Sequence, residues 1–176
     1  MDTQSVREPG IASDQPRGDQ VHRSAEAGTA PERSTASDGV LAHLDRAACL
    51  ALLAGRPVGR LVFTHGALPD VIPVNYRMDG EALVIRLSSG SVAASATTDA
   101  IVAFEVDDID IPSRTGWSVT VVGRAHAIVH EAQLSRAQSL GLSSWVSGSR
   151  DQYVSIATEK ITGRRLFQAS DTAHLD

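Results

Sequence analysis

Hydrophobic and polar residues change their spacing several times between residues 40 and 168, and each spacing predicts an element. Asp45 is a candidate N-cap of a first helix, and Gly55 followed by Pro57 marks its end. This pattern predicts one short amphipathic helix at the start of the folded region. Its apolar positions share helical spacing: Leu41, Leu44, Ala48 and Leu52.

After this helix, runs rich in β-branched residues predict a series of strands. Asp79 and Gly80 separate two of these runs and are a strong signal for a β-hairpin. Small helices are expected between strands, over residues 91–99 and 131–140. Together these elements predict a mainly β, α+β domain built on a closed or partly closed antiparallel β-barrel. The strands are expected over residues 58–64, 70–78, 82–88, 100–107, 116–130 and 153–167.

The termini differ in composition from the predicted barrel. Residues 1–39 contain few large apolar side chains, so they cannot bury enough surface to offset the entropy of ordering, and we expect a disordered N-terminal tail. An arm that orders on a partner is the alternative interpretation. The folded domain is expected over residues 40–170, followed by a flexible C-terminus at 171–176.

Composition excludes several classes of function. The net charge of -5 argues against nucleic acid and anionic membranes as partners. No apolar run approaches the roughly 20 residues needed to span a bilayer, so a soluble, cytoplasmic protein is expected. The single cysteine, Cys49, excludes an internal disulfide and is expected to be a small buried residue.

Motifs of the common enzyme classes are missing from the sequence. It contains no GxGxxG, P-loop, HExxH or GxSxG motif. His126 and His130 would lie about 13 Å apart on one strand, too far to share a metal ion. We therefore expect no metal site, and no residue is assigned as a catalytic acid or base.

One strand-turn-helix segment has the residues of an anion site. Arg86 lies near the end of a predicted strand, and Ser88, Ser89 and Ser91 follow in the turn, with Ser91 a candidate N-cap. Hydroxyls, backbone N–H groups and a guanidinium suit a phosphate, although an ordinary polar turn has the same appearance. In the neighbouring strand, Asn75 offers both donors and acceptors for a heterocyclic ring, or for a local backbone bond.

Residues 116–125, GWSVTVVGRA, contain glycines in an otherwise β-branched run. A glycine in such a run marks a bulge, a barrel corner, or a close approach of another backbone or a ligand. Trp117 is either plain core or the apolar wall of a cleft.

The order of these segments resembles the pyridoxamine 5'-phosphate oxidase-like family of FMN-binding split β-barrels. The resemblance covers about residues 40–168, and its most specific part is GWSV followed by VxGxA, after PVNY and a FEVD strand. It implies an antiparallel six-stranded split β-barrel with short flanking helices, which forms a homodimer with a flavin cleft at the interface. The stretches that carry it are VGRLVFT, LPDVIPVNYRMDG, LVIRLSSGS, VAFEVDDID, GWSVTVVGRA, SSW and ITGRRLF.

Carried over by position, the resemblance places Val74 and Asn75 at the isoalloxazine ring. Trp117 and Ser118 would line the same cleft from the second subunit. On this reading Gly123 is the bulge that bends its strand around the barrel. The phosphate region would be formed by Arg86, Ser88, Ser89 and Ser91.

The sequence departs from the family pattern at two positions of the phosphate region. Leu87 stands where the family often has threonine, and Val92 stands at the lysine position. Both changes remove a polar phosphate contact, and charge-assisted hydrogen bonds are the strong ones.

The resemblance implies an FMN-binding flavoprotein and an FMN-dependent oxidoreductase acting on an unknown small molecule. Two alternatives stay open. One is a non-catalytic flavin carrier or interaction module with a degraded phosphate site, which Leu87 and Val92 motivate. The other is an F420-dependent reductase, although the acidic tail of F420 needs a basic groove.

Overall fold

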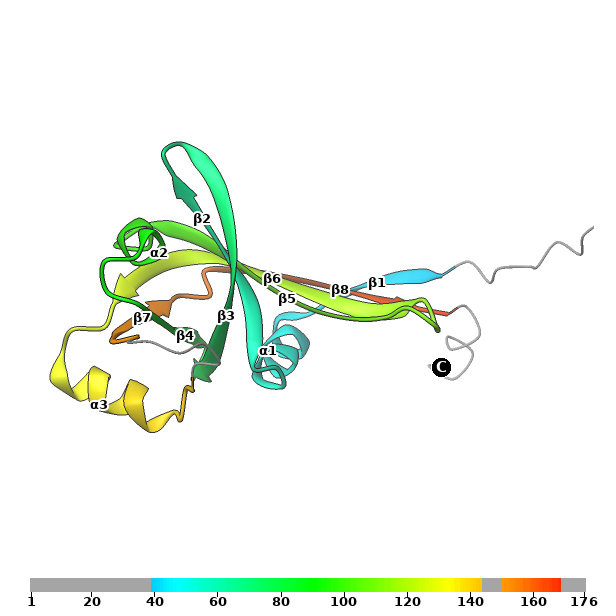
Figure 1. Cartoon of the computed structure of the whole chain (residues 1–176). Coiled ribbons are helices and arrows are strands. Elements are labelled where there is room, and N and C mark those ends of the chain that lie inside the picture. Colours follow the sequence, from blue (N-terminus) through cyan, green and yellow to red (C-terminus); the bar gives the residue numbers. More distant parts are fainter. Residues whose placement is uncertain (1–38, 144–149, 169–176) are drawn as a thin grey trace, which may run out of the picture. The chain divides into compact units, whose positions relative to one another are not determined.

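The computed structural model describes residues 39–143 and 150–168 of the 176-residue chain. Within this part, three short helices accompany one antiparallel sheet (Figure 1). The helices are α1 (Arg46–Ala54), α2 (Val92–Ala96) and α3 (Glu131–Ser139). The strands are β1 (Val40–Leu44), β2 (Val58–His65), β3 (Leu68–Asp79), β4 (Ala82–Leu87), β5 (Ile101–Asp110), β6 (Thr115–Ala127), β7 (Gln152–Ile156) and β8 (Lys160–Phe167).

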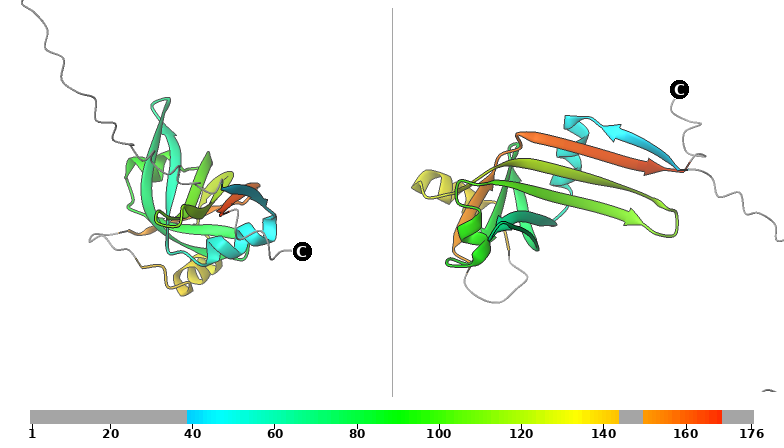
Figure 2. Two further views of the ribbon diagram at one scale, coloured as in Figure 1. Left: turned by 90° about the vertical axis from the view of Figure 1, so that its right-hand side faces the viewer. Right: turned by 90° about the horizontal axis from the view of Figure 1, so that it is seen from above.

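Six of these strands form a closed ring. They are hydrogen-bonded in the order β6-β5-β2-β3-β4-β7, and a pairing between β6 and β7 closes the ring. The predicted six-stranded antiparallel split barrel is therefore confirmed. The strands β8 and β1 continue the sheet from the first half of β6, and the three strands β5, β6 and β8 extend away from the barrel (Figures 1 and 2).

Strand β6 changes partner at Gly123. Its residues 116–122 pair with β8, whereas Ala125 and the two residues after it pair with β7. A Cβ atom on Gly123 would lie 1.7 Å from the carbonyl oxygen of Ala157, which is in the link between β7 and β8. Of the three roles expected for a strand glycine, Gly123 has the close approach of another backbone, at a corner of the barrel.

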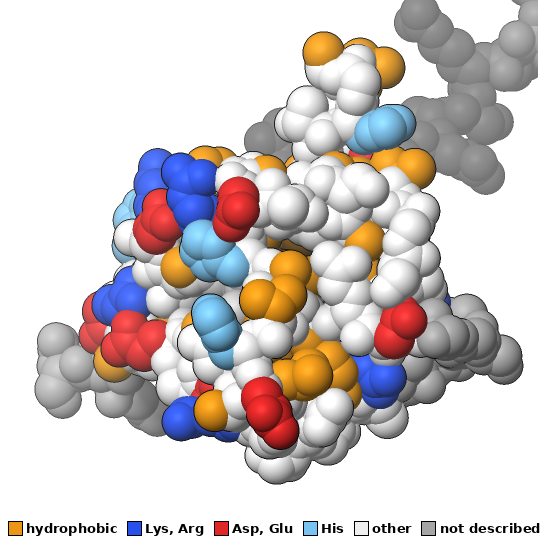
Figure 3. All heavy atoms as spheres, turned by 90° about the vertical axis from the view of Figure 1, so that its left-hand side faces the viewer, with side chains coloured by type: hydrophobic (Ala, Val, Ile, Leu, Met, Phe, Trp, Pro, Cys, Tyr) orange, Lys and Arg blue, Asp and Glu red, His pale blue; other side chains and the backbone are white. Residues whose placement is uncertain are grey.

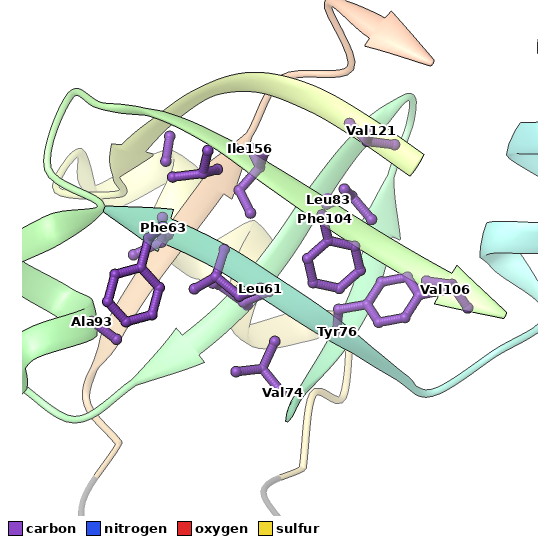
Figure 4. Close-up of a cluster of buried hydrophobic side chains, with 14 of the residues drawn as sticks. Leu61, Phe63, Val74, Tyr76, Leu83, Ala93, Phe104, Val106, Val121 and Ile156 are labelled. Atoms are coloured by element: carbon purple, nitrogen blue, oxygen red, sulfur yellow. The ribbon is translucent and has the colours of Figure 1, made fainter. Parts of the chain in front are cut away.

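Large apolar side chains from opposite strands fill the barrel (Figure 4). Tyr76 and Phe104 meet edge to face with ring centroids 4.9 Å apart, and both are fully buried. The Tyr76 hydroxyl donates to the carbonyl of Leu53, so it joins α1 to the barrel wall. A second, smaller cluster lies under α3 and includes Val84 and Tyr153.

Three local expectations are wrong. Residues 40–44 form strand β1 instead of the first turns of a helix, and α1 begins only after Asp45, whose side chain accepts from the N–H of Ala48. Residues 153–167 form two strands, β7 and β8, because the chain crosses β6 between them. The strand expected over residues 100–107 does not end there, because β5 continues through the acidic residues to Asp110.

The other elements agree with the sequence. The hairpin at Asp79 and Gly80, the helix capped by Ser91 and the helix at 131–139 are confirmed, and Cys49 is fully buried. The tails expected at residues 1–39 and 171–176 lie outside the described residues, Gly39 excepted. No helix in the described part of the chain is long and apolar enough to cross a membrane.

Candidate functional site

The candidate ring site lies on an edge of the sheet. Strand β3 pairs with β2 along residues 68–75, but it pairs with β4 only from Tyr76 to Asp79. The side of β3 that faces away from β2 is therefore a sheet edge around Pro73. This position explains the proline, which has no N–H to donate to a neighbouring strand.

A pocket at this edge brings together three of the residues predicted for the site. Val74, Asn75 and Arg86 line it, together with Pro73, Leu142, Ser143 and Arg150. Val74 is buried, and Asn75 is partly exposed, with its amide nitrogen 3.5 Å from the carbonyl of Pro57. The pocket is thus lined by one residue with an amide and one with a guanidinium, beside Val74, whose side chain belongs to the barrel core.

The Arg86 guanidinium is already engaged by the chain itself. Its Nε donates to the carbonyl oxygen of Arg150 at 2.9 Å, and another nitrogen donates to that of Leu142 at 3.3 Å. The group also lies over the ring of Tyr153, 4.9 Å from its centroid, which is a cation–π geometry. In this arrangement Arg86 joins the backbone at Leu142 to the backbone at Arg150.

The serines of the predicted phosphate turn differ in their roles. Ser91 is the N-cap of α2 and accepts from the N–H of Ala94 at 3.1 Å, as predicted. The N–H of Ser91 donates to the carbonyl of Ser88 and closes the turn. Ser89 donates twice to the same carboxylate oxygen of Asp151, from its N–H at 3.1 Å and from its hydroxyl at 2.7 Å.

The two departures from the family pattern lie in different environments. Leu87 is 1% exposed and belongs to the barrel core. Val92 is 47% exposed at the first position of α2. At the threonine position the chain therefore has a leucine that packs in the core, whereas at the lysine position it has a valine exposed on the surface.

Trp117 and Ser118 are not brought to this pocket within one chain. Trp117 packs against the barrel core and lines a different pocket, where residues of β5, β6 and β8 meet. The Arg56 guanidinium lies 5.8 Å from the centroid of its ring. Ser118 stands opposite Asp107 of β5 and Arg164 of β8.

A third pocket was not anticipated from the sequence. It lies between α3 and the ends of β6 and β7, on the side of the molecule that Figure 3 shows. His126 Nδ1 lies 2.8 Å from a carboxylate oxygen of Asp99, which has a positive φ of 50°. Ser155 stands opposite His126 in the ladder and lines the same pocket. The sequence could not indicate that Asp99 and His126 lie close together, because they come from separate elements.

The closed ring of six antiparallel strands defines the class of antiparallel split barrels. The profile of the pyridoxamine 5'-phosphate oxidase family matches residues 45–165. This match covers more than half of the chain. The chain therefore belongs to the pyridoxamine 5'-phosphate oxidase family, as the resemblance of its motifs implied.

Two individual relatives match most of the described chain. Uncharacterized protein Rv0080 of Mycobacterium tuberculosis is 40% identical over 135 residues, which are 74% of this chain and 88% of that protein. The structure of an FAD-binding protein from Mycobacterium smegmatis is 31% identical, with a TM-score of 0.61, and the match covers 72% of this chain and 97% of that one.

An FAD-binding protein from Mesorhizobium loti has the same fold at lower identity. It is 21% identical, with a TM-score of 0.61, over 74% of this chain and 100% of that one. At this identity the comparison supports the fold alone.

Proposed function

We propose that this protein binds a flavin, with the isoalloxazine ring at the pocket formed by Val74, Asn75 and Arg86. The observation that carries the proposal is the convergence of these three residues at the open edge of β3. Membership of the pyridoxamine 5'-phosphate oxidase family supports it, as does the 31% identity to an FAD-binding protein. FMN is the first cofactor to test, and the protein would act as a flavin-dependent oxidoreductase on a small molecule.

The residues present fit the ring end of a flavin. Val74 supplies an apolar surface, and the amide of Asn75 can both donate to and accept from the polar edge of the ring. A bound flavin would supply the redox chemistry, and the chain would supply binding, orientation and exclusion of water. The phosphate end fits less well, because Ser89 and Arg86 already donate to groups of the chain.

We further propose that a second subunit completes the cleft. Trp117 and Ser118 lie away from the Val74 pocket within one chain, so they can contribute only from a partner. Light scattering should then give a mass near twice 18.6 kDa. A strict monomer would contradict this part of the proposal.

An absorbance spectrum of the purified protein between about 300 and 500 nm tests the cofactor directly, followed by titration of the apoprotein with FMN and with FAD. The Asn75→Leu variant should lose most of the affinity for both flavins. Gln133→Leu is a matched control, since it removes an exposed amide from α3 at a different pocket. A colourless protein that ignores both flavins would refute the proposal, and equal losses in the two variants would refute the role of Asn75.

The two alternatives predict other outcomes of the same measurements. A flavin carrier would bind FMN or FAD but show no reduction by nicotinamide donors and no turnover of any acceptor. An F420-dependent reductase would bind F420 in preference to FMN, although the acidic tail of F420 needs a basic groove and the net charge of the chain is -5. Competition between F420 and FMN decides between the two cofactors.

A further inference from the structure

The turn expected to hold a flavin phosphate already holds an anion of the protein. Asp151 presents one carboxylate oxygen to both the N–H and the hydroxyl of Ser89, at 3.1 Å and 2.7 Å. These are the donors that a phosphate oxygen would use at this turn. Asp151 directly precedes β7 and is 62 residues from Ser89 in sequence.

The carboxylate of Asp151 is ionised near neutral pH. The hydrogen bonds from Ser89 hold the pKa of Asp151 below its ordinary value, and the charge of Arg86 acts in the same direction. A dianionic phosphate that approached Ser89 would therefore meet a negative charge as well as occupied donors.

The nearby cation Arg86 is not available to a phosphate, because the chain already engages it. The Arg86 guanidinium donates to the carbonyls of Arg150 and Leu142 and stacks on Tyr153, so moving it toward a phosphate would break these contacts. At the start of α2, Val92 has no ammonium group to offer.

We infer that Asp151 is an internal competitor for the phosphate of the cofactor, which makes this protein discriminate against a terminal phosphate monoester. The inference rests on the proposed flavin site and specifies the selectivity of that site. Ring recognition at Val74 and Asn75 is separate from the Ser89 turn, so the competition acts on FMN and leaves riboflavin unaffected. The ratio of the FMN and riboflavin affinities is the quantity that Asp151 controls.

The test compares FMN with riboflavin, which has the same ring without the phosphate, in the full-length protein. Dissociation constants are measured by flavin fluorescence quenching for the wild type, Asp151→Asn and Asp151→Ala. The alanine variant is included because an asparagine oxygen can still accept from Ser89. Asp70→Asn is the matched control, since it removes the same charge from an exposed carboxylate that accepts from the N–H of Val71.

We expect both Asp151 variants to bind FMN about 3- to 10-fold more tightly than the wild type, as removal of a competing charge-assisted hydrogen bond implies. Riboflavin affinity should stay unchanged, and Asp70→Asn should behave as the wild type.

An unchanged ratio of FMN to riboflavin affinity in both Asp151 variants would overturn the inference, and so would an equal gain for the two ligands. Failure of both flavins to bind to any of the four proteins would instead refute the proposed flavin site, and the inference would fall with it.

Discussion

Gly123 is the position where the barrel depends most directly on the absence of a side chain. We predict that Gly123→Ala strongly destabilises the protein. The new Cβ would lie 1.7 Å from the Ala157 carbonyl oxygen, and ordinary contact begins near 3.4 Å, so this backbone would have to retreat by about 1.7 Å. The movement would break the hydrogen bond from Ala157 N–H to the Arg124 carbonyl, now 3.0 Å long.

The cost follows from these losses. A net backbone hydrogen bond contributes about 1 kcal/mol, and forcing extra atoms into a packed region costs roughly 1 to 3 kcal/mol. The adjacent closure of the ring between β6 and β7 buries Val154 and Ile156, which would loosen as well. We therefore expect a loss of about 3 kcal/mol or more, which corresponds to a fall in Tm of roughly 10 °C for a domain of this size.

Thermal unfolding followed by circular dichroism, together with urea titration, measures the effect. Gly55→Ala is the matched control, because Gly55 has a φ of -81° and its new Cβ would meet the nearest atom at an ordinary 3.5 Å. The control should change stability by less than about 1 kcal/mol, toward greater stability. A Gly123→Ala protein whose Tm lies within 2 °C of the wild type by either method would refute the reasoning (~2 °C is well under 1 kcal/mol).

Three further predictions concern single side chains. Tyr76→Phe removes the hydrogen bond to Leu53 and should lower the free energy of unfolding by about 1 kcal/mol in urea titration. Because burial raises the pKa of Tyr76, the wild type should be more stable than the variant below the unfolded pKa near 10, and this difference should disappear as the pH rises further. A stability difference that stays constant at high pH would contradict this prediction. Cys49 is fully buried, so a thiol reagent should modify it only at the rate of unfolding, and rapid labelling of the native protein would show the burial to be wrong. Val92→Lys should tighten FMN binding about 3- to 10-fold in fluorescence titration, whereas Ser95→Lys, on the exposed side of the same helix, should not; equal effects would indicate nonspecific charge.

Short-range patterns were sufficient to predict most of the barrel. The alternation of β-branched residues, the Asp79 and Gly80 hairpin signal and the N-caps at Asp45 and Ser91 are all local, and the structure has each of them. Residues 40–44 were wrongly predicted as helix because their apolar spacing is helical, whereas their actual structure depends on pairing with a distant strand. Val40 pairs with Phe167, and no periodicity within a short window reports a strand so far along the chain.

The break between β7 and β8 has a similar cause. Residues 153–167 resemble one continuous β run in the sequence. In the structure β7 pairs with β4, the chain then passes close to Gly123 of β6 at Ala157, and β8 pairs with the first half of β6. The crossing depends on Gly123, which is in a different strand. Sequence reasoning recognised that Gly123 was unusual but could not identify the backbone that approaches it.

The candidate site divides in the same way. The resemblance of their motifs placed Val74 and Asn75 at the ring and Arg86 in the phosphate region, and all three residues line one pocket. Asp151 was not predicted, since an exposed aspartate in a loop has no distinguishing pattern. Its contact with Ser89 becomes visible only when β4 and β7 are placed side by side.

The positions that weaken the phosphate region are not equivalent, and the difference follows from their burial. Leu87 is part of the barrel core, so restoring a threonine there would place a hydroxyl among apolar neighbours and cost stability. Val92 and Asp151 are exposed, so both can be changed without disturbing the core. In the proposed flavin site, we therefore expect phosphate affinity to be adjustable at the surface, through Val92 and Asp151, while the ring site on β3 stays constant.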